Sequence, residues 1–125
     1  MTTTTEDYVS FETAKLLKEK GFEGECSRFY MPSGHGRWKY EHYHDFDIRE
    51  RIDCPTQQMV LKWLREIHDI DIMIWVENYN GVKQYVSDCW KHVTQIDYNF
   101  YRCGRFSSYN EACEAAIKYC LEHLI

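Results

Sequence analysis

The chain has 125 residues, enough for one domain that removes roughly two thirds of its unfolded surface from water. A hydrophobic content of 44% and an aromatic content of 16% exclude a disordered chain. The formal net charge is −5, and the 15 basic residues form no cluster, which argues against nucleic-acid binding. Acidic residues are interleaved with Lys and Arg, which also argues against a nucleic-acid mimic.

Residues 1–7 are polar and predict a disordered tail before a single domain over residues 8–125. This N-terminus lacks the basic and apolar regions of a signal peptide, and no run of about 18 apolar residues could span a membrane. We therefore expect a cytoplasmic protein that does not bind membranes.

The first predicted helix covers Phe11–Lys20. Ser10 is suited to cap its free amide groups, and Gly21 is suited to end it. Aromatic residues and alternation then predict two strands, Cys26–Met31 and Arg37–His44, joined as a hairpin. The segment Asp45–Asp53 mixes apolar and charged residues, so it is either a short edge strand or an ordered loop.

The clearest pattern runs from Cys54 to Gly81. Apolar residues at three- and four-residue spacing predict a helix over Thr56–His68 with one buried stripe, formed by Met59, Val60, Trp63, Leu64 and Ile67. From Ile70 the period changes to two, which predicts a strand with isoleucines on one face and Met73 and Trp75 on the other. Asn80-Gly81 predicts a two-residue type I′ turn. Pairing Tyr79 with Val82 then places Val86 opposite Trp75.

A further strand is predicted over Val93–Tyr101 by alternation, and Ser108-Tyr109-Asn110-Glu111 is a capping box that opens a helix running to the C-terminus. The whole pattern predicts an α+β fold in which three helices pack on one face of a mostly antiparallel sheet of about five strands.

The second half has the element order of a double-stranded-RNA-binding domain. Its last helix, however, begins without the lysines that such a domain uses to contact phosphates.

Six cysteines could form three disulfides in a secreted chain. The missing signal peptide, the size of the core and the absence of any C-x-x-C pair favour free thiols instead. Cys113 and Cys120 fall on the apolar stripe of the last helix, where cysteine is usually a small core residue.

Three segments resemble a group of small uncharacterised proteins from Bacteroides-type gut bacteria and their phages or mobile elements: Tyr8–Phe22, Pro55-Thr56 with Lys62–Glu66, and Tyr109–Leu121. The resemblance covers the three predicted helices. It implies a bacterial or phage origin and a cytosolic setting, which is the host cytoplasm if the protein is phage-encoded. It implies no ligand and no catalytic residue.

One candidate site is a metal centre. In a strand, His42 and His44 share a face, and Asp45 or Asp47 at the strand end could add a carboxylate for a divalent cation. The alternative for these four residues is a solvated polar strand end.

A second candidate is an aromatic binding surface. Trp38, Tyr40, His42 and His44 share a strand face that could stack on a ligand or a partner, although Trp38 and Tyr40 could equally belong to the core. The third candidate consists of Met73 and Trp75 on the back of the central strand. That face is either an exposed apolar patch or is covered by the N-terminal hairpin or the stretch near Tyr98.

No phosphate-binding loop, dinucleotide-binding motif or serine-hydrolase motif occurs, and no sequence context activates a cysteine. We therefore expect no catalytic residue and no cofactor. The sequence favours a non-catalytic module that binds a protein partner or itself through an aromatic sheet surface. The alternative is a small metal- or ligand-binding enzyme centred on His42, His44 and Asp45.

Overall fold

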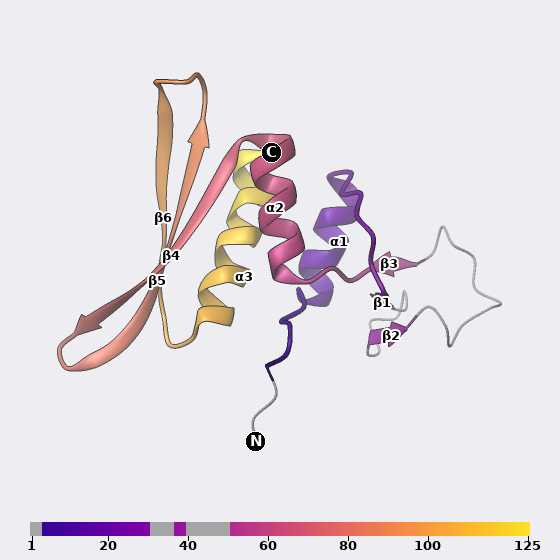
Figure 1. Ribbon diagram of the computed structural model, residues 1–125, viewed down its shortest axis with the longest axis horizontal. Helices are drawn as coiled ribbons and strands as arrows, with labels where there is room; N and C mark the ends of the chain where they lie inside the picture. The colour runs from indigo at the N-terminus through magenta and orange to yellow at the C-terminus, as the bar shows by residue number, and fades with distance from the viewer. Residues whose placement is uncertain (1–3, 31–36, 40–50) are drawn as a thin grey trace. The chain divides into compact units, whose positions relative to one another are not determined.

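The computed structural model describes residues 4–30, 37–39 and 51–125, with backbone alone for 37–39. In these residues the chain forms an α+β fold, as the sequence predicts (Figure 1). The elements in order are α1 (Phe11–Glu19), β1 (Arg28–Tyr30), β2 (Arg37–Lys39), β3 (Ile52–Asp53), α2 (Gln57–His68), β4 (Ile70–Tyr79), β5 (Val82–His92), β6 (Tyr98–Phe106), α3 (Tyr109–Tyr119) and the π-helical segment η2 (Cys120–Leu124).

The strands do not form the one sheet of about five strands that the sequence suggested. They form two antiparallel three-stranded sheets, in the orders β2-β1-β3 and β4-β5-β6. The chain divides accordingly into two compact units, residues 1–59 and 60–125. In the described residues β1 pairs with both β2 and β3, β5 pairs with both β4 and β6, and no strand joins the two sets. Alternation along a strand predicts which side chains share a face, but it does not specify which distant strand is the partner.

In the first unit, the predicted cap of α1 is confirmed, since the Ser10 hydroxyl accepts a hydrogen bond from the Thr13 amide at 3.2 Å. The Tyr30 hydroxyl donates to the Val9 carbonyl at 2.8 Å. The backbone amide of Gln57 donates to the Asp7 carbonyl at 2.8 Å. Asp7, the last residue of the predicted disordered tail, is therefore bonded to the folded chain. Residues before α1 thus contact both β1 and the start of α2.

The second unit is organised by the β4–β5 hairpin. Asn80 and Gly81 have φ values of 51° and 79°, which confirms the type I′ turn. Tyr79 pairs with Val82 and Trp75 with Val86, so the predicted register is also confirmed. Because side chains alternate, this register decides which residues of the two strands share a face.

A β-bulge interrupts the pairing of β5 with β6. Ser87 pairs with Gly104 and Asp88 with Arg102, which leaves Cys103 as the extra residue. Gly104 has a φ of 134°, a backbone angle that residues with a side chain rarely adopt. As a result, Arg102 and Arg105 lie on the same face although they are three residues apart.

The helix α3 packs across all three strands of this sheet, and Figure 1 shows it along one side of them. Ser108 caps it by accepting from the Glu111 amide at 3.2 Å, and Ser107 donates to the Glu111 carboxylate. Small residues, Ala112, Cys113 and Ala116, are fully buried on it. They allow the helix to approach the strands closely, so one sheet face is covered.

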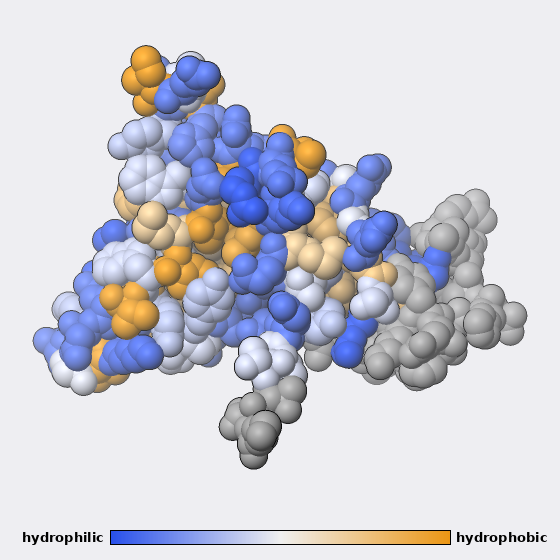
Figure 2. Space-filling view, in the orientation of Figure 1, coloured by the Kyte–Doolittle hydropathy of each residue, from blue (hydrophilic) through white to orange (hydrophobic). Residues whose placement is uncertain are grey.

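Two predictions of local detail are wrong. Ile67, predicted to lie on the buried stripe of α2, is 67% exposed, whereas Val60 and Leu64 are fully buried. The predicted strand over Val93–Tyr101 begins only at Tyr98, because residues 93–97 form a turn in which the Thr94 hydroxyl accepts from the Asp97 amide. Hydrophobic side chains are visible at this turn in Figure 2, and Ile96 is 86% exposed there.

None of the helices in the described part of the chain is both long and apolar enough to cross a membrane.

The turn predicts the effect of Gly81→Ala. No atom lies within 4 Å of an added Cβ, so the cost comes from the φ of 79° alone. We expect the free energy of unfolding in urea to fall by about 1 kcal/mol. The control Asn80→Gly permits the same backbone angles and is expected to change it by less than about 0.5 kcal/mol. Equal losses in both variants would contradict this role of the turn.

Candidate functional site

The candidate site is the face of the β4-β5-β6 sheet opposite α3. The observed register places Met73 opposite Asp88, Asp88 opposite Arg102 and Trp90 opposite Phe100. Directly paired residues share a face, so side chains from all three strands meet there. We call this surface the aromatic face: Met73, Trp75, Asp88, Trp90, Tyr98, Phe100 and Arg102.

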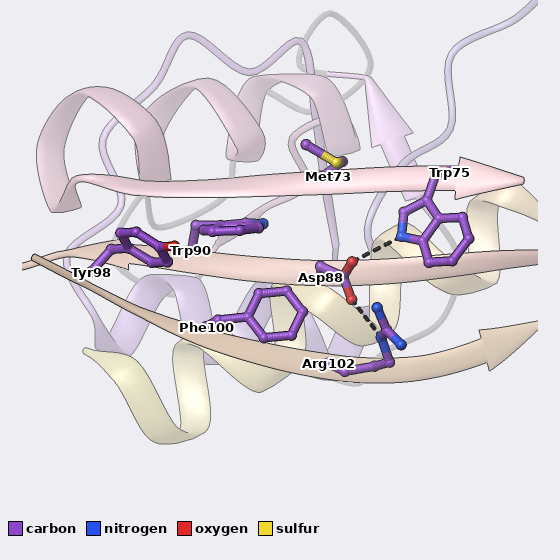
Figure 3. Close-up of a pocket in the computed structure, with 7 residues that line it drawn as sticks. All are labelled: Met73, Trp75, Asp88, Trp90, Tyr98, Phe100 and Arg102. Carbon is purple, nitrogen blue, oxygen red and sulfur yellow. Dashed lines mark hydrogen bonds and ion pairs between the residues drawn. The ribbon is translucent and has the colours of Figure 1, made fainter.

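Asp88 lies at the centre of the aromatic face and is only 4% exposed. Its Oδ2 accepts a hydrogen bond from the Trp75 indole Nε1 at 2.8 Å, and its Oδ1 accepts from Arg102 Nε at 3.0 Å (Figure 3). A buried carboxylate is costly unless it is paired and hydrogen-bonded. Asp88 therefore fixes one residue on each neighbouring strand.

Arg102 links the aromatic rings. Its guanidinium carbon lies 5.5 Å from the centre of the Trp75 ring and 5.7 Å from that of Phe100, within cation–π range. The Trp90 ring contacts those of Phe100 and Tyr98, with centroids 4.9 and 4.8 Å apart. The Arg102 guanidinium and the four aromatic rings therefore form one continuous row of contacting planar groups, drawn from all three strands.

These side chains line a shallow hollow of about 540 Å³ (Figure 3). Met73 is 54% exposed, Tyr98 52% and Phe100 43%. The volume is within the usual range of ligand sites, but such sites enclose most of their ligand. An open hollow on a sheet is better suited to one side of a larger partner.

The other charged groups on this face are also paired. His92 Nε2 lies 2.9 Å from the Asp71 carboxylate, and Arg105 Nε donates to Glu77 at 2.7 Å. The hydrogen bond that Arg105 donates to Glu77 raises the pKa of Arg105. Each of these carboxylates thus has a nitrogen-bearing side chain of its own chain beside it, and both arginines of the face are paired.

The indole N–H of Trp90 is buried and has no hydrogen-bond partner in the part of the chain that the structure describes. A buried donor without an acceptor costs about 1–3 kcal/mol. Such groups are rare in folded proteins, and a bound water or a partner group could satisfy this one.

The opposite face carries a cluster of thiols beneath α3. The Sγ of Cys89 lies 3.3 Å from that of Cys103 and 3.5 Å from that of Cys120. For Cys103, the hydrogen bond with Cys89 and then burial raise the pKa. For Cys89, the bond with Cys103 acts to lower the pKa, but the bond with Cys120 and burial outweigh it, so the net shift is upward. All six cysteines are free, as the sequence predicts, and these thiols are poor nucleophiles.

The structure brings two of the predicted site residues together, Met73 and Trp75, on the exposed rather than the covered face. The backbone of Trp38 lies in β2, opposite Phe29. The other candidates lie outside the described residues: Tyr40, His42, His44, Asp45 and Asp47. Within residues 4–30, 37–39 and 51–125, no group of three or more His, Cys, Asp or Glu side chains could hold a metal ion.

Five residues of the aromatic face were not among the predicted site residues: Asp88, Trp90, Tyr98, Phe100 and Arg102. The turn register could have placed Asp88 and Trp90, because pairing Tyr79 with Val82 also pairs Met73 with Asp88 and Asp71 with Trp90. The stretch near Tyr98, which includes Phe100, is one of the two covers that the sequence allows for this face. Tyr98 and Phe100 lie beside Trp90 and extend the face instead.

Comparisons with known protein families, with curated proteins and with solved structures find no match for this chain.

The central role of Asp88 predicts a large effect of Asp88→Ala. Removing the carboxylate leaves the Trp75 indole N–H without its acceptor and Arg102 without its partner. We expect the free energy of unfolding to fall by about 2 kcal/mol and the Trp75 Nε1–H signal to shift in proton–nitrogen NMR spectra.

The matched control is Asp71→Ala, since Asp71 also pairs across strands but its side chain is 50% exposed. It is expected to cost less than about 1 kcal/mol. If the free energy of unfolding falls equally in both variants, the buried Asp88 carboxylate does not stabilise the face more than an exposed one, and the assignment is contradicted.

From the raised pKa values of the buried thiols we expect the free energy of unfolding to fall at alkaline pH. Unfolded cysteines lose their proton near pH 8.5, whereas the raised pKa values of Cys89 and Cys103 keep these thiols protonated in the folded state. Above that pH the unfolded state binds fewer protons, so the free energy of unfolding falls as pH rises. Urea unfolding between about pH 8 and pH 10 measures the slope. Cys103→Ser should make the slope shallower, and an unchanged slope would contradict the assignment.

Proposed function

We propose that the protein is a small non-catalytic interaction module of a bacterium or phage, working in the cytoplasm, and that it binds a protein partner through the aromatic face. The observation that carries the proposal is the exposure of Met73, Tyr98 and Phe100 together on one sheet face. Contiguous exposed apolar groups on a folded protein usually mark an interaction site. The bacterial or phage setting rests on the resemblance of the helices.

The composition of the face supports a protein partner. Trp, Tyr and Arg contribute most of the binding energy in protein interfaces, and this face has all three around a buried centre. Asp88 holds Trp75 and Arg102 in place before binding, so less side-chain entropy is lost on association.

The charges support a neutral, apolar partner surface over a nucleic acid. Arg102 and Arg105 are each paired with a carboxylate of the same face. Binding to single-stranded nucleic acid through stacked aromatics also needs cations free to meet phosphates. The face provides the stacking groups without that charge.

Affinity capture tests the proposal. The full chain, immobilised, should retain a protein from a lysate of its host, and the captured partner should bind with a measurable Kd. Phe100→Ala should weaken this binding about 10- to 100-fold, because Phe100 is a ring near the centre of the face.

The control is Ile96→Ala, which removes a more exposed apolar side chain from the turn between β5 and β6. It should leave the Kd unchanged. The proposed function would be contradicted if a Met73→Ala, Phe100→Ala double variant bound the partner with the wild-type Kd. It would also be contradicted if the unmodified chain retained no partner.

A further inference from the structure

The second unit has two edge strands, β4 and β6, and β6 is the better protected against pairing with another strand, because the charged residues of β4, Asp71 and Glu77, lie outside its centre. Strand β6 carries the bulge at Cys103, Gly104 and the two arginines, features that discourage strand addition. Strand β4 pairs with β5 through ten residues with no shift of register, and it contains neither Pro, Gly nor Lys. Its centre, Ile72–Val76, is apolar throughout.

The turn shows which backbone groups of β4 point outward. The residues that flank a two-residue turn form a hydrogen-bonded pair, and such pairs alternate along an antiparallel ladder. Tyr79 therefore points its backbone groups toward β5, as do all odd-numbered residues of β4. The bond from the His92 amide to the Asp69 carbonyl, 3.0 Å long, fits this alternation.

The even-numbered residues consequently point their N–H and C=O groups away from the sheet. Ile70 is fully buried and follows α2 closely, so the accessible part of this edge begins at Ile72. Val76 is 55% exposed. No strand in the described part of the chain pairs with the edge from Ile72 to Asn78.

We propose that this edge binds the same edge of a second copy, antiparallel, about a two-fold axis near Trp75. In that register Ile74 lies opposite Val76 of the second copy and Ile72 lies opposite Asn78. The two edges, each running from Ile72 to Asn78 and roughly 20 Å long, then join two three-stranded sheets into one.

A second copy fits this edge for two reasons. A strand added beside β4 must be apolar on both faces, because Met73 and Trp75 flank it on one side and isoleucines on the other, and β4 itself meets that requirement. The acidic residues also favour this register. With the axis at Trp75, Asp71 of one copy is not directly opposite Glu77 of the other, whereas a shift of the axis to Ile74 would place these two carboxylates directly opposite each other.

The dimer is independent of the proposed function, because it uses the backbone of β4 and leaves the aromatic face open. Association would place the aromatic faces of two copies on one continuous sheet. A partner could then meet two of them at once, which raises its apparent affinity without any new contact.

Sedimentation equilibrium and amide hydrogen exchange test the proposal on the unmodified chain. The measured mass should rise from 15.1 kDa toward twice that value as the protein concentration increases. The amides of Ile72, Ile74 and Val76 should become protected over the same range, while those of Met73 and Trp75 stay protected throughout. A monomer at all concentrations, or a dimer whose even-numbered amides remain unprotected, would overturn it.

Val76→Pro removes one outward amide without breaking a bond to β5, and Val76→Thr keeps that amide as the matched control. The proline variant should be monomeric and the threonine variant dimeric. A dimeric Val76→Pro protein would refute the edge contact. If that variant fails to fold, protection of the outward amides in the wild type decides the question. Phe100→Ala should remain dimeric, which separates this test from that of the aromatic face.

Discussion

The carboxylate of Asp88 is the constraint on which the second unit's exposed surface depends. It sits on the central strand, nearly out of contact with water, and one hydrogen bond from each neighbouring strand compensates the cost of burying it. Those two bonds fix Trp75 and Arg102, and Arg102 in turn lies against Phe100. A single buried carboxylate on β5 thus holds aromatic groups of β4 and β6 in one arrangement.

The bulge on β6 matters to both faces of the sheet. In a regular strand Arg102 and Arg105 would point in opposite directions, and one of them would have to be buried under α3. The extra residue turns Arg105 back to the exposed face, where it pairs with Glu77 across the width of the sheet. On the other face, Cys103 lies against Cys89. The same irregularity also makes β6 a poor edge for strand pairing, which leaves β4 as the open one.

Local patterns in the sequence predict most of the second unit. Asn80-Gly81 determines the turn, the turn determines the register, and the register places Met73 and Trp75 on one face. The thiols are free and the helix caps are in place, because these features depend on neighbouring residues and composition.

What local patterns could not supply was the pairing of distant segments. The division of the described strands into two sheets depends on which strands pair, and this pairing joins segments that are far apart in the sequence. The bulge at Cys103 gave no signal apart from one glycine, so the pairing of both arginines on one face was not predictable. Asp88 could be placed from the turn, but its role depends on Arg102, which lies beyond the bulge.

The most direct test of an aromatic face that is open to a partner is its accessibility in the full chain. Paramagnetic relaxation by a soluble gadolinium chelate can be measured on side-chain methyl groups, with Ile96 as the exposed reference and Ala116 as the buried one. If the face is open, the Met73 methyl signal broadens nearly as strongly as that of Ile96. A Met73 signal as protected as that of Ala116 would show that the face is covered and would contradict its role as a binding surface.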